Sequence, residues 1–517
     1  MTVVLGLALG FSLSRRRELQ TMRRVLSERD RARRLGTNKA QLQHPVVDLT
    51  RCLGCATCVA ACPEEGVLEL VHGQAMVVNG ARCVGVSACE RECPVGAITV
   101  TLGDLTDRDD VPVLSSELEA VGMPGLFLAG EITAHSLIKT AVDQGAAVGR
   151  EVARRLASNG SSTSESPVLD LCVVGAGPAG LACSMIAQKS GLRFALLDQE
   201  QELGGTVAKY PRRKLVMSQP LDMPGYGRFK KQTYEKEELM AVWQDLARTH
   251  GLQLHGGQVL QGVERMEQGH FRVQTETHQF EAKHVCLALG RRGIARRLGV
   301  PGEDLHKVAY HLVDAHSYQG RRILVVGGGD SALEAAMALA EQPGNQVSLS
   351  YRQEGFFRCR AKNEERMKQC MAKGSVQVYF QSEVASITGD AVHLRMGNEV
   401  WALPNDDVFI MIGGVPPFET LKRSGVSFDS SQHQAVEALE EKGSGLTSAL
   451  LTGLCCTLLA LLFAAWHNDY YGLQDHLQPA HPKHDLLAPT KGLGLQIGIV
   501  SCVLIVFNLL YLARRSP

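Results

Sequence analysis

Apolar stretches that end in glycine-rich turns occur twice in the middle of the chain. Residues 169–198 begin with an apolar stretch, pass through a glycine-rich turn into an alanine-rich segment, and close with a second apolar stretch. This order predicts a strand, a helix and a strand. Residues 322–352 repeat the pattern. Two such units indicate an α/β chain with two Rossmann-like domains, which we place at residues 168–300 and 301–410.

Two long uncharged stretches lie near the C-terminus. Residues 446–466 carry no charge, and residues 492–513 repeat the pattern and are followed by Arg514 and Arg515. Each is long enough for a membrane-spanning helix, so we predict a transmembrane hairpin over residues 446–513, with a pair of buried core helices as the alternative. Because basic residues favour the cytoplasmic side, we expect the soluble domains at the cytoplasmic face of the inner membrane.

The first 40 residues combine a short apolar stretch with a basic one. Residues 2–14 are uncharged and are followed by three consecutive arginines. Thirteen helical residues rise only ~20 Å, less than a hydrocarbon core of ~30 Å, so we expect a short anchor. The basic helix that follows is either attracted to anionic lipid or solvated. Residues 158–167 and 431–445 have the composition of linkers.

Composition and charge narrow the range of functions. The chain has 54 Lys and Arg against 54 Asp and Glu, so its global charge gives no indication of nucleic-acid binding. Its 52 glycines suit a fold with many tight turns. Seven of its 15 cysteines fall within residues 52–93. This crowding is typical of metal or cluster ligation in a reducing compartment and not of a disulfide framework.

The first group of cysteines has the spacing of a bacterial ferredoxin. Cys52, Cys55, Cys58 and Cys62 are separated by two, two and three residues, and Pro63 follows. In such motifs three thiolates hold one cubane and the fourth reaches the other cluster. A zinc site, which usually pairs short cysteine doublets far apart in the sequence, is the alternative.

The second group departs from this spacing at one position. Cys83, Cys89 and Cys93 end in the same Cys-Pro pair, but the middle ligand position holds Val86. The crossover of ligands then assigns the first cluster, a [4Fe–4S], to four cysteines: Cys52, Cys55, Cys58 and Cys93. The same crossover leaves three cysteines for the second cluster: Cys62, Cys83 and Cys89. We expect a [3Fe–4S] or [4Fe–4S] cluster there, with complete loss as the alternative, and a small α+β ferredoxin-like domain over residues 41–103.

The turn of the first Rossmann unit carries a complete dinucleotide motif. Gly175, Gly177 and Gly180 have the G-x-G-x-x-G spacing, and Asp198 ends the second strand. The glycines permit close approach of a pyrophosphate to the helix N-terminus, and the acid can bind a ribose hydroxyl. A glycine-rich turn without a ligand is the alternative.

The second Rossmann unit differs at the end of its second strand. Glycines occupy residues 327–329, but the strand ends in Tyr351 and Arg352, with no acid. Arginine suits a 2′-phosphate, so we expect NADPH, with NADH as the alternative. Arg358 is a second candidate for the phosphate, and solvated surface charge is its alternative role.

Four segments resemble the two-dinucleotide flavoprotein family that includes thioredoxin reductase, bacillithiol disulfide reductase and thioredoxin-reductase-like ferredoxin–NADP reductase. Residues 173–180 (VVGAGPAG) resemble its FAD motif, and residues 204–206 (GGT) resemble the loop near its flavin. Residues 288–293 (ALGRRG) resemble its central linker, and residues 325–336 (VVGGGDSALEAA) resemble its NADPH motif. The resemblance implies FAD in the first Rossmann domain and NADPH in the second.

The resemblance also implies two groups of ligand residues. Those for FAD lie at the first glycine motif, the GGT loop, the linker and an upstream segment: Gly175, Ala176, Gly177, Pro178, Ala179, Gly180, Asp198, Gly204, Gly205, Thr206, Gly290, Gly130 and Glu131. Those for NADPH lie at the second motif and after its second strand: Gly327, Gly328, Gly329, Asp330, Ser331, Arg352 and Arg358. No side chain is assigned as catalytic, because the flavin is the reactive centre.

Two features depart from the family pattern. Thioredoxin reductases carry Cys-x-x-Cys upstream of the second glycine motif, whereas residues 305–326 contain no cysteine, so we expect no dithiol relay. Residues 125–149 resemble the flavin-closing segment that normally ends the chain, with Glu131 where the family usually has Asp. We therefore expect a circular permutation, in which residues 104–157 close the FAD domain and residues 411–430 return to it.

Together these parts predict a membrane-bound NAD(P)H-dependent oxidoreductase. Its flavin handles electron pairs, and its clusters carry single electrons to or from a membrane partner, a quinone or a cytochrome. A ferredoxin–NADP reductase that uses a soluble carrier is the first alternative. A non-catalytic electron-transfer or redox-sensing subunit is the second. We expect a homodimer or a component of a membrane complex.

Overall fold

The structure, a computed structural model, describes residues 2–433 and residue 458, with side chains from residue 16 onward, except at these positions: 41, 104, 106–107, 159–166, 217–220 and 232. The predicted hairpin at residues 446–513 therefore lies outside the described residues, apart from one position. Within the part of the chain that is described, no helix combines the length and the apolar character that crossing a bilayer requires.

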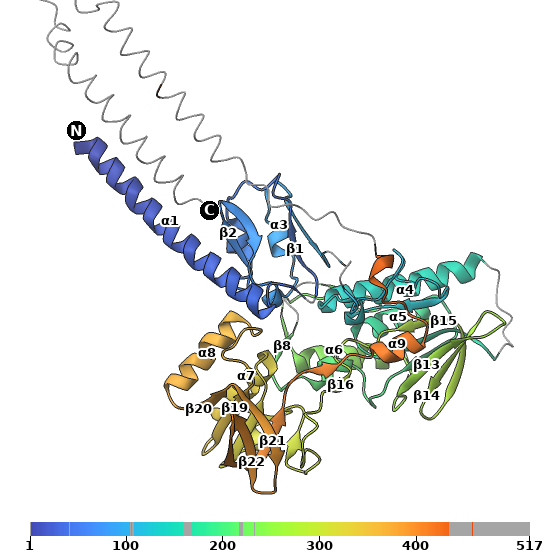
Figure 1. Ribbon diagram of the computed structural model, residues 1–517. Coiled ribbons are helices and arrows are strands. Elements are labelled where there is room, and N and C mark those ends of the chain that lie inside the picture. Colours follow the sequence, from blue (N-terminus) through green and yellow to red (C-terminus); the bar gives the residue numbers. More distant parts are fainter. Residues whose placement is uncertain are drawn as a thin grey trace, which may run out of the picture. The chain divides into compact units, whose positions relative to one another are not determined.

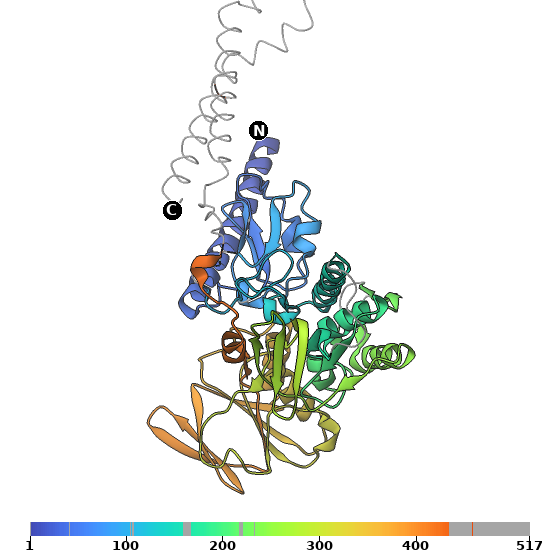
Figure 2. The ribbon, with the colours of Figure 1, turned by 90° about the vertical axis from the view of Figure 1, so that its right-hand side faces the viewer.

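A long basic helix packs against the cysteine-rich module, which we define as residues 42–103. α1 (Thr2–Leu35) buries Val25 almost completely, and Val25 packs against Val71 and Val78 of the module. Figures 1 and 2 show α1 lying along this module. Val25 and Leu26 of α1 therefore contact the module.

The cysteine-rich module contains two antiparallel strand pairs and short helices. Its elements are β1 (His44–Val47) paired with β4 (Ile98–Thr101), β2 (Leu68–Val71) paired with β3 (Gln74–Val77), α2 (Thr57–Ala61), η1 (Gly80–Arg82) and α3 (Ala88–Arg91). The predicted α+β character of this region agrees with these elements. The small core between them consists largely of cysteines and aliphatic residues.

The first α/β domain is built on a seven-stranded sheet. The strand order is β12–β7–β6–β15–β14–β13, and β5 pairs in parallel with the end of β15. The strands are β5 (Leu126–Leu128), β6 (Leu169–Val174), β7 (Phe194–Leu197), β12 (Leu254–His255), β13 (Leu260–Arg265), β14 (Phe271–Thr275) and β15 (Gln279–Leu287). The smaller elements are η2 (Glu131–Thr133), η3 (Gly205–Lys209), α6 (Lys236–Thr249), β8 (Leu215–Val216) with β11 (Tyr234–Glu235), and β9 (Asp222–Met223) with β10 (Gly227–Arg228).

Segments that come before β6 and after the second domain in the sequence complete this first domain. α4 (Ile138–Ser158) precedes β6 in sequence but packs on α5 (Pro178–Lys189), as Figure 1 shows. The approach is close, because a Cβ at Gly145 would lie 1.9 Å from the carbonyl oxygen of Ala179. α9 (Phe418–Arg423) follows the second domain in sequence, and it packs back against the core of the first domain. The η5 turn (Ser430–Gln432) follows.

The second α/β domain has a parallel five-stranded sheet between two layers. Alternate residues of β18 point to opposite faces, so that Ile323 and Val325 pack with α7 and α8 while Leu324 and Val326 pack against a three-stranded antiparallel sheet. The strand order is β17–β24–β18–β19–β20. The elements are β17 (Val308–Ala309), η4 (Ala315–Ser317), β18 (Arg322–Val326), α7 (Asp330–Ala340), β19 (Gln346–Tyr351), α8 (Ala361–Ala372), β20 (Val376–Phe380), β21 (Ser382–Ile387), β22 (Ala391–Met396), β23 (Glu399–Pro404), β24 (Asp407–Ile410), and β16 (Ile294–Ala295) paired with β25 (Gly414–Val415).

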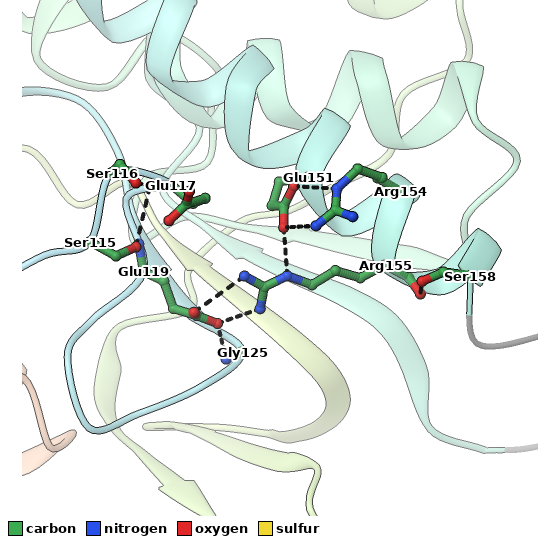
Figure 3. A network of polar contacts seen from close by, with 9 residues as sticks. All are labelled: Ser115, Ser116, Glu117, Glu119, Gly125, Glu151, Arg154, Arg155 and Ser158. Carbon is green, nitrogen blue, oxygen red and sulfur yellow. Dashed lines mark hydrogen bonds and ion pairs between the residues drawn. The ribbon is translucent and has the colours of Figure 1, made fainter.

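An ionic network ties α4 to the loop before β5. The guanidinium of Arg155 bonds the carboxylate of Glu119, with Nη1 2.5 Å from Oε1, and its Nε bonds Glu151 at 2.7 Å (Figure 3). Glu119 also accepts the backbone N–H of Gly125. The Arg155–Glu119 pair is mostly shielded from solvent, with exposed fractions of 26% and 18%. The network therefore anchors α4, and with it the residues that resemble the flavin-closing segment.

We expect Arg155→Met to lower the free energy of unfolding by about 1–3 kcal/mol, because the partly buried Glu119 loses its partner. Arg154→Met is the matched control: Arg154 bonds the same Glu151 but is 70% exposed, so solvent screens the pair and a clearly smaller loss than in Arg155→Met is expected. Urea unfolding measures both values. Equal losses in the two variants would show that the Glu119 contact contributes nothing.

The same network predicts a pH dependence. Hydrogen bonds from Arg154 and Arg155 lower the pKa of Glu151 from 4.5 to about 2. The pKa of Glu119 is also below its usual value, because Arg155 and Gly125 outweigh the opposing effect of burial. Carboxylates with depressed pKa values stabilise the fold above pH 4.5, and this stability is lost as the pH falls toward 2. The loss of stability with acid is expected to be shallower in Arg155→Met than in the wild type.

Candidate cluster and nucleotide sites

Four cysteines of the module line one small cavity. Cys52, Cys55 and Cys58 come from the loop before α2 and its first turn, and Cys93 comes from the loop after α3. These are the four cysteines that the ligand crossover assigns to the first cluster, and the cavity does not include Cys62. We call this set the first cysteine site.

Hydrogen-bond donors point at the sulfurs of the first cysteine site. The backbone N–H of Ala97 donates to Sγ of Cys93 at 3.2 Å, and the hydroxyl of Thr57 lies 3.3 Å from Sγ of Cys55. The bond from Thr57 lowers the pKa of Cys55. Donors to cluster sulfurs are among the features by which proteins set a reduction potential, so this arrangement suits an iron–sulfur cluster.

The remaining cysteines of the module form a second group. Cys62, Cys83 and Cys89 pack in the small core of the module. Burial, followed by the charges of Cys62 and Cys83, raises the pKa of Cys89 to about 11. They are the predicted ligands of the second cluster, and we call them the second cysteine site. Val86 lies half-buried at the position of the absent fourth cysteine, and its carbonyl oxygen accepts a bond from Arg91.

The two cysteine loops have the same backbone conformation. Gly54 and Gly85 both have φ of +69°, and Ala56 and Ser87 follow with φ of +62° and +57°. A Cβ at Gly54 would lie 1.9 Å from the carbonyl oxygen of Gly73, so the first loop requires glycine there. The second loop therefore keeps the conformation of the first although it lacks the middle cysteine.

The described residues contain no group of three or more His, Cys, Asp or Glu side chains placed to hold a metal ion. A single zinc ion requires each sulfur at about 2.3 Å from one point.

The first glycine motif forms a turn that only glycine permits. Gly175 has φ of +109°, and a Cβ at Gly180 would lie 1.8 Å from the carbonyl oxygen of Gly175, so the helix α5 packs directly on the end of β6. Gly177 begins α5, and a Cβ there would meet no atom within 4 Å. The N-terminus of α5 is thus open at the position where a pyrophosphate would bind, and these residues fit FAD.

Asp198 braces the turn of the first motif. Its carboxylate accepts the backbone N–H groups of Ala176 at 2.5 Å and of Glu200 at 2.9 Å. Only 6% of Asp198 is exposed, and burial raises its pKa despite these bonds. The predicted ribose ligand therefore also holds the loop that would bind the pyrophosphate.

The other predicted FAD residues gather near the start of α5. The N–H of Gly204 donates to the carbonyl oxygen of Ala176, and a Cβ at Gly205 would lie 3.1 Å from Cα of Gly177. Thr206 lies 3.9 Å from the corresponding Cβ position of Gly290. The remaining predicted ligands lie within the first turn of α5 or beside it: Pro178, Ala179, Gly130 and Glu131.

Glu131 connects this region to a large cavity. Burial raises the pKa of Glu131, and the nearby Arg291 and Arg292 oppose this rise. The cavity has a volume of about 960 Å³ and extends from Glu131 and Tyr210 to the second glycine motif. Volumes of this size suit a cofactor-sized ligand.

The second glycine motif lines the other end of this cavity. Gly327 has φ of +140°, and a Cβ there would lie 2.3 Å from the carbonyl oxygen of Met411. The ring of Tyr351 lies over Gly328, whereas a Cβ at Gly329, where α7 begins, would meet no atom within 4 Å. The N-terminus of α7 is therefore open, and these residues fit a dinucleotide.

The predicted phosphate ligands differ in their surroundings. Arg352 and Arg358 are exposed, line the cavity and lie near Tyr351. Ser331 also lines the cavity. Asp330 lines it as well, and its carboxylate accepts the backbone N–H of Arg360 at 2.9 Å, which holds the start of α8.

Two known protein families match parts of this sequence. A sequence model of the pyridine nucleotide-disulphide oxidoreductases matches residues 172–446, which is more than half of the chain. The chain belongs to this family. A second model, that of a 4Fe-4S dicluster domain, matches residues 44–94.

Curated members similar to this pyridine nucleotide-disulphide oxidoreductase include two ferredoxin–NADP reductases. The one from Ignicoccus hospitalis is 27% identical over 54% of this chain and 88% of its own length. The one from Thermus thermophilus is 29% identical over 51% of this chain and 78% of its own length. Among solved structures, the bacillithiol disulfide reductase of Staphylococcus aureus is 23% identical over 51% of this chain and 81% of its own, with a TM-score of 0.45.

Family membership confirms several predictions. The protein is an NAD(P)H-dependent FAD oxidoreductase with an α/β fold and a 4Fe-4S ferredoxin domain. The type of the second cluster stays a prediction. The positions of the individual ligand residues stay predictions as well, and the structure places them as described above.

Three residues of this oxidoreductase that were not among the predicted ligands line the cavity. Tyr210, Lys214 and Arg292 line it, and the ammonium of Lys214 lies 4.8 Å from the ring centroid of Tyr210. Lys214 also pairs with Glu334 on α7 at 3.1 Å, which joins the two α/β domains. Tyr210 and Lys214 follow the GGT loop closely in sequence, but only the fold brings them opposite α7.

Proposed function

We propose that this protein transfers electrons between NADPH and one-electron carriers, and that its own ferredoxin module is the first of these carriers. The observation that supports this proposal most strongly is one continuous cavity. Its lining includes the second glycine motif with Arg352 and Arg358 in one domain, and Glu131 and Tyr210 in the other. When bound, FAD supplies the chemistry that links the two-electron donor to one-electron carriers.

The chain's own residues supply binding and orientation. The open N-terminus of α7 receives the pyrophosphate of the dinucleotide, and Arg352 and Arg358 favour a 2′-phosphate at the same end of the cavity. The absence of cysteine from residues 305–326 argues against a disulfide substrate.

A circular permutation explains the order of the segments. β5 and α4 precede the first glycine motif in the chain, yet they complete its sheet and cover its helix. In this proposal, residues 104–157 are the flavin-closing segment of the FAD domain moved to its front. The move connects this segment directly to the ferredoxin module.

The names of the relatives favour a ferredoxin-type partner. The proteins from Ignicoccus hospitalis and Thermus thermophilus are named ferredoxin–NADP reductases, and this chain carries a ferredoxin-like module of its own. A membrane partner is the second candidate, because residues 446–466 and 492–513 are uncharged. In that case the protein would lie at the cytoplasmic face of the inner membrane and would exchange electrons with a quinone or a cytochrome.

Anaerobic titration of the purified protein with NADPH tests the proposal. We expect the flavin absorbance to bleach first and the EPR signals of reduced iron–sulfur clusters to follow. A flavin that stays oxidised in excess NADPH would contradict the proposal and favour a redox-sensing subunit. Reduction of a quinone in reconstituted membranes without added ferredoxin would decide for the membrane partner over the soluble one.

A further inference from the structure

The second cysteine site lies where the module contacts the FAD domain. The carbonyl oxygen of Val84 accepts the hydroxyl of Ser136 at 3.4 Å. The side-chain amide of Gln43 donates to the carbonyl oxygen of Gly85 at 2.8 Å. The backbone N–H of Gln43 donates to the carbonyl oxygen of Ala134, in the FAD domain, at 3.2 Å. The loop that carries Val84 and Gly85 is therefore bonded to the segment that begins at Glu131.

Two ion pairs join the same site to the NADPH domain. Arg82, directly before a ligand cysteine, bonds Glu364 of α8 at 2.5 Å, and the exposed fractions of the two side chains are 16% and 20%. Glu64, two residues after another ligand cysteine, pairs with Arg360 at the start of α8 at 3.4 Å. Both chain segments that supply this site are thus held against α8.

The first cysteine site has none of these contacts. Its cavity is lined only by residues of the module itself. Leu53 is 72% exposed, and Cys55 is also exposed. No hydrogen bond or ion pair found among the described residues joins residues 52–58 to either α/β domain. Among the described residues, this site is therefore bonded only within the module.

We propose that the second cysteine site is the inner station, which exchanges electrons with the flavin, and that the first cysteine site is the outer station, which exchanges them with the external carrier. This inference rests on the proposed function and adds the order of the two clusters. The contacts of Val84, Arg82 and Glu64 place the inner station against the nucleotide domains, and the exposure of Leu53 and Cys55 leaves the outer station accessible.

The electron balance of this order is simple. Each NADPH loses two electrons and becomes NADP⁺, with the release of one proton. The electrons leave singly through the inner and then the outer station, so that two molecules of a one-electron carrier are reduced. The reverse order applies when the carrier is the donor.

Two ligand variants test the order by spectroscopy. In Cys83→Ser, anaerobic NADPH is expected to bleach the flavin but to reduce the outer cluster at least tenfold more slowly than in the wild type. Dithionite should still produce the EPR signal of that cluster, which shows that it is assembled. In Cys55→Ser, NADPH is expected to reduce the inner cluster at the wild-type rate. An outer cluster reduced at the wild-type rate in Cys83→Ser would overturn the proposal.

A double variant that keeps every ligand cysteine, together with a control variant, tests the order of the two stations even if Cys83→Ser fails to assemble its clusters. Arg82→Gln combined with Glu364→Gln loosens the contact between the inner station and α8, so stopped-flow reduction of both clusters should slow at least tenfold while the flavin bleaches normally. Arg366→Gln, on the same helix but paired with Glu341 and with no residue of the module among the described contacts, is the control and should change neither rate. Cluster reduction at the wild-type rate in the double variant would also overturn the proposal.

The outcomes separate this inference from the proposed function. If NADPH does not bleach the flavin of the wild-type protein, the proposed function is wrong. If the flavin bleaches and the outer cluster is reduced without the inner one, the function stands and the order is wrong.

Discussion

Gly177→Ala is expected to fold normally and to bind FAD ten- to a hundredfold more weakly, a loss of about 1.4–2.8 kcal/mol. The φ of Gly177 is −75°, which alanine adopts readily, and no atom lies within 4 Å of the added Cβ. The protein without FAD should therefore keep its stability. The Cβ would instead occupy space at the open N-terminus of α5, where the pyrophosphate must approach the backbone. Titration of the FAD-free protein with FAD measures the affinity, and thermal unfolding measures the stability.

Gly329→Ala is the matched control in the second motif. Gly329 has the same position at the start of α7, a φ of −92° and an equally open Cβ direction. We expect this variant to retain FAD and to lose NADPH affinity, which reverses the pattern of Gly177→Ala. Unchanged FAD affinity in Gly177→Ala would show that the flavin pyrophosphate does not bind at this turn.

The double substitution of Arg352 and Arg358 by alanine is expected to remove the preference for NADPH over NADH. A hydrogen bond to a charged group contributes about 1.5–3 kcal/mol, so NADPH affinity should fall at least tenfold. NADH has no 2′-phosphate, and its affinity should change little. Both arginines are exposed and line the cavity, so the fold should tolerate their loss. Rapid-reaction bleaching of the flavin by each nucleotide gives both affinities.

Arg296→Ala serves as the control for this experiment. Arg296 lines the same cavity, but it comes from the segment between the two α/β domains and not from the end of β19 that carries Arg352. We expect this variant to keep the ratio of NADPH to NADH affinity. A ratio that stays at the wild-type value in the double variant would assign the phosphate to other residues.

Local chemistry made much of this protein predictable. The spacing of Gly175, Gly177 and Gly180 identifies a dinucleotide turn because the steric demands of such a turn are local. The spacing of the cysteines identifies a two-cluster module for the same reason, since ligands of a cluster must lie on a tight loop. Membership of the pyridine nucleotide-disulphide oxidoreductases and the match to a dicluster domain confirm the two kinds of domain, while the individual ligand residues stay predictions.

Contacts between distant segments were not predictable in this way. Arg82 and Glu364 are 282 positions apart, and neither belongs to a motif. Tyr210 and Lys214 lie outside the glycine motif that the GGT loop accompanies, and their place in the cavity depends on how α7 approaches the first domain. Asp198 was expected at a ribose, and the structure adds its role in bracing Ala176.

The sequence alone predicted the cofactor-binding turns, the cysteine ligand sets and an α/β fold, because these depend on residues that are close together in the chain. The tertiary structure was needed to show that α4 covers α5, that one cavity joins the two nucleotide domains, and that ion pairs hold the segments of the second cysteine site against α8 while Cys55 of the first site is exposed. Packing and ion pairing between remote segments depend on how whole domains meet, and no local pattern of residues records that geometry.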